Sequence, residues 1–417
     1  MRRVSGLLFA AAMFCGPPSA RAADYPGAWV QYVADGGLEV RSIVAPGMNC
    51  PALVADGIPV ASEERGAPTP AYAVKVCAGR VPEGARSLNA DGLPLPLPPR
   101  ALRRIVVLGD TGCRLKGAAV QDCNSPAAWP FDTIARRAAA QRPDLIIHVG
   151  DYHYRESACP EGRPGCAGSP FGDNWAVWQR DFFNQAGPLL AAAPWVMVRG
   201  NHESCDRGGI GWFRLLEPRP TTTCTAMTEP YALSIAGQQL LIFDGADADD
   251  PKAPPEKVAA YRPQFASLLA QAKPRAWLLT HRPIWSLAQF AGAPGGVTLN
   301  ATEQEAIRGL VPPQLDMVIA GHVHSFMSFD FGPARPAQLV VGNGGDANDA
   351  ITQPIIPGKM IDGVPIRRGM GIGDYGYLVL DRREGGWAGT VRGLDDAVLA
   401  RCTLYGRSVN CVKTPGR

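Results

Sequence analysis

Short runs of apolar residues recur through the last three quarters of the chain, and each run ends in a polar residue. Residues 105–108 end in Gly109-Asp110, and residues 145–149 end in Gly150-Asp151. Segments with helical spacing of apolar residues separate the runs, at residues 131–141, 174–190, 255–272 and 302–310. This alternation is typical of an α/β domain. Because open α/β sheets bind ligands at the carboxyl ends of their strands, we expect the polar residues to gather at one edge.

The residue types that follow these runs are those that bind metal ions. The set is Asp110, Asp151, Asn201, His281, His322 and His324, with Tyr154 just beyond the second strand. The chain has only six histidines; three belong to this set and a fourth, His202, adjoins it. Packing alone does not account for such crowding, so the pattern predicts a metal site.

Each fragment alone has an ordinary explanation. Gly109-Asp110 could be a turn, and His322-Val323-His324 could be two imidazoles at a strand edge. Gly200-Asn201-His202-Glu203 is more specific, because Asn is a poor structural choice after a buried strand. The occurrence of all the fragments together, in this order, indicates a functional site.

Five segments resemble motifs of the purple acid phosphatase branch of the calcineurin-like binuclear metallophosphoesterase superfamily. That branch has an Asp after the first strand, GDxxY, GNH followed by an acid, VxxH and GHxH. The matching segments are Gly109-Asp110, Gly150-Asp151-Tyr152-His153-Tyr154, Gly200-Asn201-His202-Glu203, Leu278-Leu279-Thr280-His281 and Gly321-His322-Val323-His324. Leu278 in place of Val is the only departure, and the resemblance covers about residues 103–346.

Two positions indicate the branch. Other branches usually have Asp-x-His in the first motif, where this chain has Gly112, and this chain has Tyr154 in the second. The resemblance implies an α/β fold: a metallophosphoesterase-type β-sandwich flanked by helices (α/β/β/α), preceded by a small β-rich N-terminal module.

The resemblance also implies a binuclear metal centre. One metal, Fe(III), would be held by Asp110, Asp151, Tyr154 and His324. The second, a divalent Fe, Zn or Mn ion, would be held by Asp151, Asn201, His281 and His322, with Asp151 bridging. Hard anionic oxygens suit trivalent iron, and imidazole and amide oxygen suit a divalent ion. Since a free Tyr has a pKa near 10, a nearby +3 charge is what would make Tyr154 a ligand at neutral pH.

The implied activity is that of a phosphomonoesterase that hydrolyses a small phosphate ester with metal-activated hydroxide. His202 would steady the phosphate or protonate the leaving alkoxide, or would only orient Asn201 or Asp151. His153 faces either the substrate or the surface, and Arg282 pairs with phosphate or forms a structural salt bridge. The alternatives are a phosphodiesterase and a non-catalytic metal- or phosphate-binding protein. Two Gly-rich loops, residues 287–299 and 342–346, either shape the pocket or are plain turns.

The first 22 residues have the features of a secretory signal. Arg2 and Arg3 precede a short apolar stretch, and Ala20-Arg21-Ala22 is a small-x-small cleavage site. We expect cleavage after Ala22 and a secreted or periplasmic protein, by either the general or the twin-arginine route. This segment has three Arg and no acidic residue, so its removal brings the net charge of +3 to zero. The composition therefore gives no signal for nucleic acid, and no apolar run approaches the roughly 20 residues that would anchor the chain in a membrane.

Ten of the eleven cysteines lie beyond the signal, and in an exported chain they suggest disulfides. Pairing of sequence neighbours is the simplest of many connectivities: Cys50 with Cys77, Cys113 with Cys123, Cys159 with Cys166, Cys205 with Cys224, and Cys402 with Cys411. A Cys-rich zinc site is the competing interpretation, and the absence of any CxxC disfavours it.

The segment before the α/β region has a different pattern. Residues 25–87 contain short β-type runs separated by Gly and Pro, and residues 93–99 alternate Pro and Leu as a stiff linker does. The sequence therefore predicts a signal peptide at residues 1–22, a β-rich module with its linker at 23–100, and a catalytic domain at 101–417.

Overall fold

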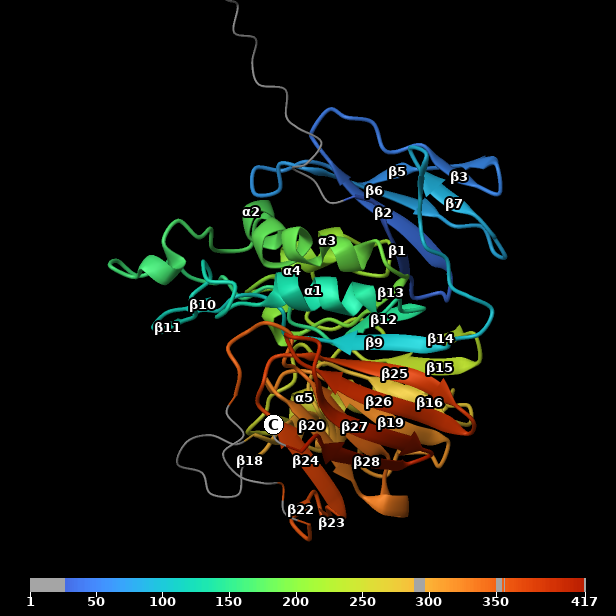
Figure 1. Cartoon of the computed structure of the whole chain (residues 1–417), viewed down its shortest axis with the longest axis vertical. Helices are drawn as coiled ribbons and strands as arrows, with labels where there is room; N and C mark the ends of the chain where they lie inside the picture. Colours follow the sequence, from blue (N-terminus) through green and yellow to red (C-terminus); the bar gives the residue numbers. More distant parts are fainter. Residues whose placement is uncertain (1–26, 289–296, 350–354, 356, 416–417) are drawn as a thin grey trace, which may run out of the picture.

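The computed structural model describes residues 27–288, 297–349, 355 and 357–415, and two β-sheets form its centre (Figure 1). The predicted signal peptide, and residues 289–296 of the first Gly-rich loop, lie outside the described residues.

The first sheet has eleven strands. In spatial order they are β28 (Ser408–Lys413), β27 (Val398–Tyr405), β26 (Gly386–Arg392), β25 (Tyr377–Arg383), β9 (Arg104–Leu108), β12 (Leu145–His148), β13 (Trp195–Met197), β1 (Trp29–Tyr32), β2 (Leu38–Val44), β6 (Lys75–Arg80) and β5 (Glu63–Gly66). β9, β12, β13 and β1 run parallel to one another, whereas the outer pairs are antiparallel.

The second sheet has seven strands. Four adjacent strands, β15, β16, β19 and β21, run parallel to one another. In spatial order it consists of β14 (Tyr231–Ile235), β15 (Gln238–Ile242), β16 (Ala276–Leu279), β19 (Leu315–Ala320), β21 (Ala337–Val341), β20 (Phe326–Asp330) and β24 (Arg368–Ile372). Three small ribbons pair β10 (Leu115–Lys116) with β11 (Ala119–Val120), β17 (Leu287–Ala288) with β18 (Val297–Thr298), and β22 (Met360–Ile361) with β23 (Val364–Pro365).

Helices cover the outer faces of the two sheets. They are α1 (Phe131–Ala140), α2 (Trp175–Trp178), α3 (Asn184–Leu190), α4 (Gly209–Leu215), α5 (Pro255–Leu269) and α6 (Ala301–Ile307). A π-helical turn, Gln179–Phe183, joins α2 to α3. Each of the four segments predicted to be helical therefore contains a helix.

The side chains of β9 show how the layers form, because strand residues alternate between the two faces of a sheet. Ile105 and Val107 pack into the core between the sheets with residues such as Leu240 of β15. Val106 and Leu108 pack on the other face against Ile134 of α1. Beyond the second sheet, a third core holds buried residues of α5 and α6. The layers are thus helix, sheet, sheet and helix, and the predicted α/β/β/α fold is confirmed.

The N-terminal residues are rich in β-structure, and part of them joins the first sheet. β1 pairs in parallel with β13, with Gln31 opposite Trp195, so β1, β2, β6 and β5 extend that sheet. A separate four-stranded sheet packs on this extension in the order β4 (Ile58–Val60), β3 (Leu53–Ala55), β7 (Leu88–Ala90) and β8 (Leu93–Pro94). Figure 1 shows these strands, in blue, at one end of the molecule.

Side chains reinforce this junction. Trp29 is fully buried and its ring lies 5.4 Å from that of Phe183. Gln31 Nε2 donates a hydrogen bond to the carbonyl of Leu216, and the buried Arg41 guanidinium donates to the carbonyls of Leu215 and Glu217. The junction is therefore both apolar and hydrogen-bonded.

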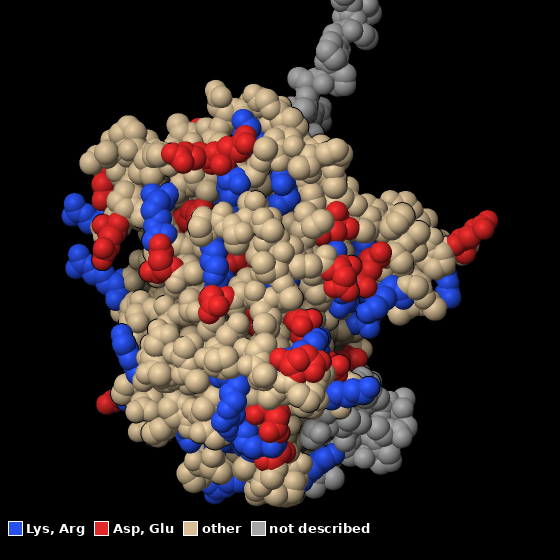
Figure 2. Space-filling model, turned by 180° about the vertical axis from the view of Figure 1, so that it is seen from behind, with Lys and Arg blue, Asp and Glu red and all other residues tan. Residues whose placement is uncertain are grey.

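The surface carries charges of both signs. On the face shown in Figure 2, Lys and Arg are interspersed with Asp and Glu, without a broad patch of one sign. Among the described residues, no helix is both long and apolar enough to cross a membrane.

We predict that Trp29→Ala destabilises the whole chain and not only its N-terminal strands. Loss of a large buried aromatic side chain costs about 3–5 kcal/mol in the free energy of unfolding. We therefore expect a single calorimetric transition that moves to lower temperature. Met48→Ala is the control, because the Met48 side chain in the same region is exposed. Two separate transitions, with only one moved by Trp29→Ala, would contradict the prediction.

Candidate metal centre

The structure brings the seven predicted metal ligands together where strands of both sheets end. Asp110, Asp151 and Asn201 follow the parallel strands β9, β12 and β13 of the first sheet. His281 and His322 follow β16 and β19 of the second sheet. The site therefore lies at the carboxyl edges of the two facing sheets, as the strand pattern predicted.

The backbone is strained at three of these positions. Asp110, Asp151 and His322 have φ values of 57°, 59° and 71°, in the left-handed region that non-glycine residues rarely adopt. Such conformations cost about 1–3 kcal/mol each and persist only where the surroundings hold them. At each of these residues the left-handed conformation turns the backbone sharply after the strand, and the turn directs the side chain of that residue into the cluster.

The glycines before three of the ligands are needed because different segments of the backbone approach one another closely here. A Cβ atom at Gly150 would collide with the ring of His281, and one at Gly321 with Asp110. A Cβ atom at Gly200 would collide with Asp151. The Gly of each motif thus makes room for a ligand that comes from another strand.

His281 lies at the centre of one half of the cluster. Its Nδ1 is 2.8 Å from the carbonyl oxygen of Val149, so this nitrogen carries the proton and Nε2 is left as an acceptor. Nε2 lies 3.0 Å from Asn201 Oδ1 and 3.1 Å from Asp151 Oδ2. One ligand atom each from Asp151, His281 and His322 fits within 4.8 Å of the others, close enough to share one metal ion.

Tyr154 lies at the centre of the other half. Its hydroxyl oxygen is 3.0 Å from Asp110 Oδ1, 2.9 Å from Asp151 Oδ2 and 3.0 Å from His324 Nε2. A hydroxyl has one proton and can satisfy only one of these acceptors. Four fully or almost fully buried polar atoms this close together are well placed to bind a cation, and the donor set fits the predicted trivalent metal.

The surroundings of Tyr154 explain why a metal is needed to ionise it. Burial, and then the charges of Asp110 and Asp151, raise the pKa of Tyr154 well above its usual value. The phenolate therefore forms only where a metal cation replaces the proton.

Glu203 holds the Asp151 loop in place. Its two carboxylate oxygens accept hydrogen bonds from the backbone N–H groups of Gly200, Asp151, Tyr152 and His153, at 2.8–3.0 Å. The acidic residue after the GNH motif thus positions the backbone of the neighbouring loop.

His202 lies over the ring of Tyr154, with 3.8 Å between the ring centroids. Its backbone N–H donates to Asp151 Oδ1 at 2.8 Å, and its Nδ1 lies 2.6 Å from Glu156 Oε1. The guanidinium of Arg207 contacts both His202 and Glu156. The imidazole is thus beside the cluster and oriented by a carboxylate.

The structure does not place His153 where the sequence analysis expected it. The side chain is 1% exposed, so it faces neither the surface nor the cluster. Its Nε2 lies 3.1 Å from the carbonyl oxygen of Gly172, and its ring packs near Trp178. Neighbouring side chains of this segment point in different directions, because Tyr154 lies in the cluster while His153 packs near Trp178.

Arg282 forms an ion pair with Asp250, and its Nη1 also lies 3.1 Å from His322 Nε2. This arrangement agrees with the salt-bridge interpretation of Arg282, although the guanidinium borders the cluster.

In the second Gly-rich loop, Asp346 N donates to the carbonyl oxygen of Asp110, and a Cβ at Gly344 would collide with Gly109. That loop therefore packs directly on the first ligand strand.

Sequence reasoning missed several charged residues that border the cluster. They are Arg114, Glu156, Arg207, Asp250 and Asp346, and each comes from a loop. Loops carry no hydrophobic period from which to infer the direction of a side chain. Glu156 and Arg114 did have a local signal, because they lie two and four residues from Tyr154 and Asp110.

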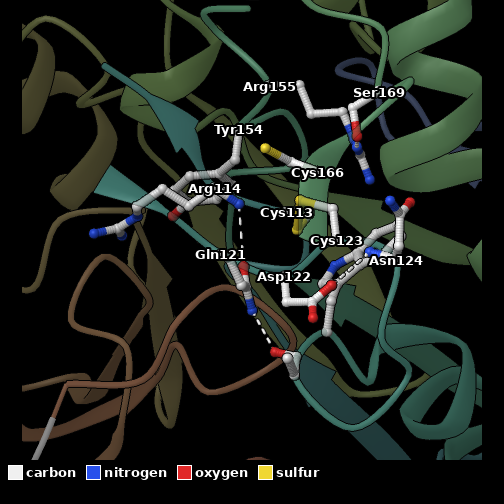
Figure 3. Close-up of a disulfide and its surroundings, with 12 residues drawn as sticks. Cys113, Arg114, Gln121, Asp122, Cys123, Asn124, Tyr154, Arg155, Cys166 and Ser169 are labelled. Carbon is white, nitrogen blue, oxygen red and sulfur yellow. Dashed lines mark hydrogen bonds between the residues drawn. A yellow bond between two sulfur atoms is a disulfide. The ribbon is translucent and has the colours of Figure 1, made fainter. Parts of the chain in front are cut away.

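The cysteines pair as neighbours in sequence, and three of the five disulfides belong to loops of the site. Cys113, Cys159 and Cys205 follow Asp110, Tyr154 and Asn201 by three to five residues. Figure 3 shows the Cys113–Cys123 disulfide beside Tyr154, Arg114 and Cys166.

The carboxylate of Asp181, in the π-helical turn, ties this loop to the Tyr154 segment. It accepts hydrogen bonds from the backbone N–H groups of Cys113 and Tyr154, at 3.3 and 2.9 Å. Its charge is balanced by the fully buried guanidinium of Arg155. The Asp181 carboxylate therefore holds the first two ligand loops side by side, while the Cys113–Cys123 disulfide closes the first of them.

Comparisons with known proteins agree with this geometry. The sequence model of the calcineurin-like phosphoesterase family matches residues 103–326, more than half of the chain. No curated protein sequence matches significantly. Among solved structures, the purple acid phosphatase PPD1 from yellow lupin (Lupinus luteus) seeds is similar with 14% identity and a TM-score of 0.55, over 93% of this chain and 74% of that one. PhoD is similar with 12% identity and a TM-score of 0.59, over 95% of this chain and 94% of that one. At such identities the structural likeness shows the fold alone.

We predict that the disulfides beside the cluster matter for function more than a distant one does. Replacement of Cys113 and Cys123 by Ser frees the loop between Asp110 and Arg114, so we expect weaker metal retention and lower hydrolytic activity. The control is replacement of Cys402 and Cys411 by Ser, which removes a disulfide between β27 and β28. That variant should lose stability, by up to about 2–4 kcal/mol, but keep its metals. Equal metal content in both variants, measured after dialysis, would contradict the prediction.

Proposed function

Because this chain belongs to the calcineurin-like phosphoesterase family, we propose that it is an exported phosphomonoesterase of the purple acid phosphatase type. The family makes the chain a phosphoester-hydrolysing enzyme, and members of this superfamily use binuclear metal centres. The choice of branch, of substrate and of compartment is the proposal.

One observation carries the choice of branch: the Tyr154 hydroxyl lies within 3.0 Å of Asp110, Asp151 and His324. A buried phenol among two carboxylates and an imidazole supplies the hard oxygen ligands that trivalent iron prefers. The five disulfides support an oxidising compartment, in keeping with a secreted or periplasmic protein with a signal peptide.

The proposed ligand sets follow the two halves of the cluster. Fe(III) would be held by Asp110, Asp151, Tyr154 and His324, and a divalent Fe, Zn or Mn ion by Asp151, Asn201, His281 and His322. When bound, such a pair of ions acts as a Lewis acid that activates water and neutralises the phosphoryl oxygens.

Substrate binding and proton transfer would be carried out by side chains beside the metal ligands. The His202 imidazole, held by Glu156 and Arg207, is placed to bind a phosphoryl oxygen or to give a proton to the leaving alkoxide. The guanidinium of Arg207 contacts His202 and that of Arg282 contacts His322, so each places a cation beside the cluster that favours an anionic substrate. A small phosphate monoester, which is a dianion near neutral pH, suits these two guanidinium groups and the proposed metal ions.

A panel of nitrophenyl esters tests the activity. We predict that metal-loaded protein hydrolyses p-nitrophenyl phosphate faster than bis(p-nitrophenyl) phosphate, and that His202→Ala lowers kcat by about 10²–10⁴-fold. His153→Gln is the matched control, since that imidazole is turned away from the cluster.

A higher rate on the diester would favour the phosphodiesterase alternative. Protein that holds two metals but cleaves neither ester would favour a non-catalytic binding role.

We also predict that oxidised, iron-loaded protein is violet, because a phenolate bound to Fe(III) absorbs visible light. Tyr154→Phe should abolish this colour. Tyr152→Phe is the control, since the Tyr152 hydroxyl donates to the carbonyl of Val198 and lies outside the cluster. A visible spectrum with iron analysis measures both. A colourless wild type with full iron content would argue against phenolate ligation.

A further inference from the structure

Two imidazoles of the cluster share an arrangement that no sequence motif describes. His322 and His324 each lie close to other ligands of the cluster, and each has one ring nitrogen beside a carboxylate. Each carboxylate is in turn paired with an arginine. The two sets are His322–Asp250–Arg282 and His324–Asp346–Arg114.

In the first set, His322 Nε2 lies 2.9 Å from Asp250 Oδ2. This contact leaves Nδ1 as the nitrogen available to a metal. Asp250 belongs to the loop after β15, and its backbone carbonyl accepts a hydrogen bond from Ala301 N at the start of α6. The Arg282 side chain closes the set by an ion pair with Asp250 Oδ2.

In the second set the nitrogens exchange roles. His324 Nε2 faces Tyr154 and Asp110. Its Nδ1 lies 2.8 Å from Arg114 Nη2, 3.1 Å from the carbonyl oxygen of Ala347 and 3.3 Å from Asp346 Oδ2. Asp346 is fully buried, and the Arg114 guanidinium forms an ion pair with it. Arg114 directly follows Cys113, whose disulfide with Cys123 lies beside it (Figure 3).

The geometry points to Asp250 and Asp346 as positioning residues, each of which orients one imidazole toward a different metal of the proposed binuclear centre. A carboxylate on the second nitrogen of a ligating imidazole fixes the ring and its tautomer and makes the ligand more basic. The arginines balance the charge of each carboxylate and hold it in place.

A purely structural ion pair explains the arrangement less well. Buried ion pairs contribute little net stability, because removal of the charges from water offsets their attraction. Asp346 is nevertheless fully buried, and Asp250 is partly buried, with 24% exposure of its side chain. Each also directs an oxygen at a ring nitrogen, which a stabilising pair does not require.

Matched substitutions test the assignment, which rests on the proposed metal centre. Asp250→Asn and Arg282→Gln break the same ion pair, but only the first removes the carboxylate from His322, whereas the second removes the guanidinium that lies 3.1 Å from the same ring nitrogen. We expect Asp250→Asn to weaken Zn²⁺ binding to iron-loaded protein by about 10–100-fold, with the violet absorption retained. Arg282→Gln should cause a smaller loss. Competition with a chelator measures Zn²⁺ affinity without any substrate.

Substitutions in the second set should instead affect the iron and its violet absorption. Asp346→Asn should weaken iron retention and shift or bleach the violet absorption, and Arg114→Gln should do so less. A folding defect caused by the broken ion pair would appear in both members of each set. Equal losses of metal in the two members, or no loss in either, would overturn the inference.

Hydrolysis by the wild type is measured separately, so the two proposals fail in different ways. Wild-type protein that binds both metals but cleaves no ester removes the proposed function and leaves the positioning roles open to the same comparison. An active wild type with equal metal losses in each pair of variants removes the positioning roles alone.

Discussion

The carboxylate of Asp151 is the group on which the rest of the site depends. One of its oxygens accepts a hydrogen bond from the backbone of His202, and the other lies about 3 Å from both Tyr154 and His281. The Asp151 side chain is almost completely buried, and the groups around it include few hydrogen-bond donors. A buried anion of this kind is costly unless a cation or a set of donors compensates it. The surrounding backbone provides one such donor, the N–H of His202, and the proposed metal ions would provide the cations.

Holding Asp151 there requires compensation elsewhere in the fold. Its own backbone and those of Asp110 and His322 are strained, and the Glu203 carboxylate and three loop disulfides oppose the relaxation of that strain. These restraints lie on the loops, while the strands behind them have ordinary apolar cores. The stable sheets therefore support ligand loops that would not adopt their strained conformations on their own.

The strand ends were predictable because they depend on local information. A buried strand followed by Gly and a ligand, as at Gly150-Asp151, appears in the sequence as an apolar run with a defined end. The pairing of β1 with β13 was not predictable in this way, since a strand's hydrophobic pattern does not name its partner. The carboxylates of Asp250 and Asp346 escaped for a similar reason, because their positions depend on how loops pack. His153 shows the limit within a motif, where spacing alone does not give the direction of a side chain.

The two sheets contribute different chemistry to the cluster. Every oxygen ligand proposed here, from Asp110, Asp151, Tyr154 and Asn201, follows a strand of the first sheet, whereas the imidazoles follow strands of the second. A metal held by both sets of residues would join the two layers of the sandwich as well as supply a Lewis acid. Since a ligand that binds only the folded state stabilises it by mass action, metal loading and the packing of the sheets are coupled. The anionic side of the centre would repel itself without the cations, so the same ions that supply the chemistry also hold its two halves together.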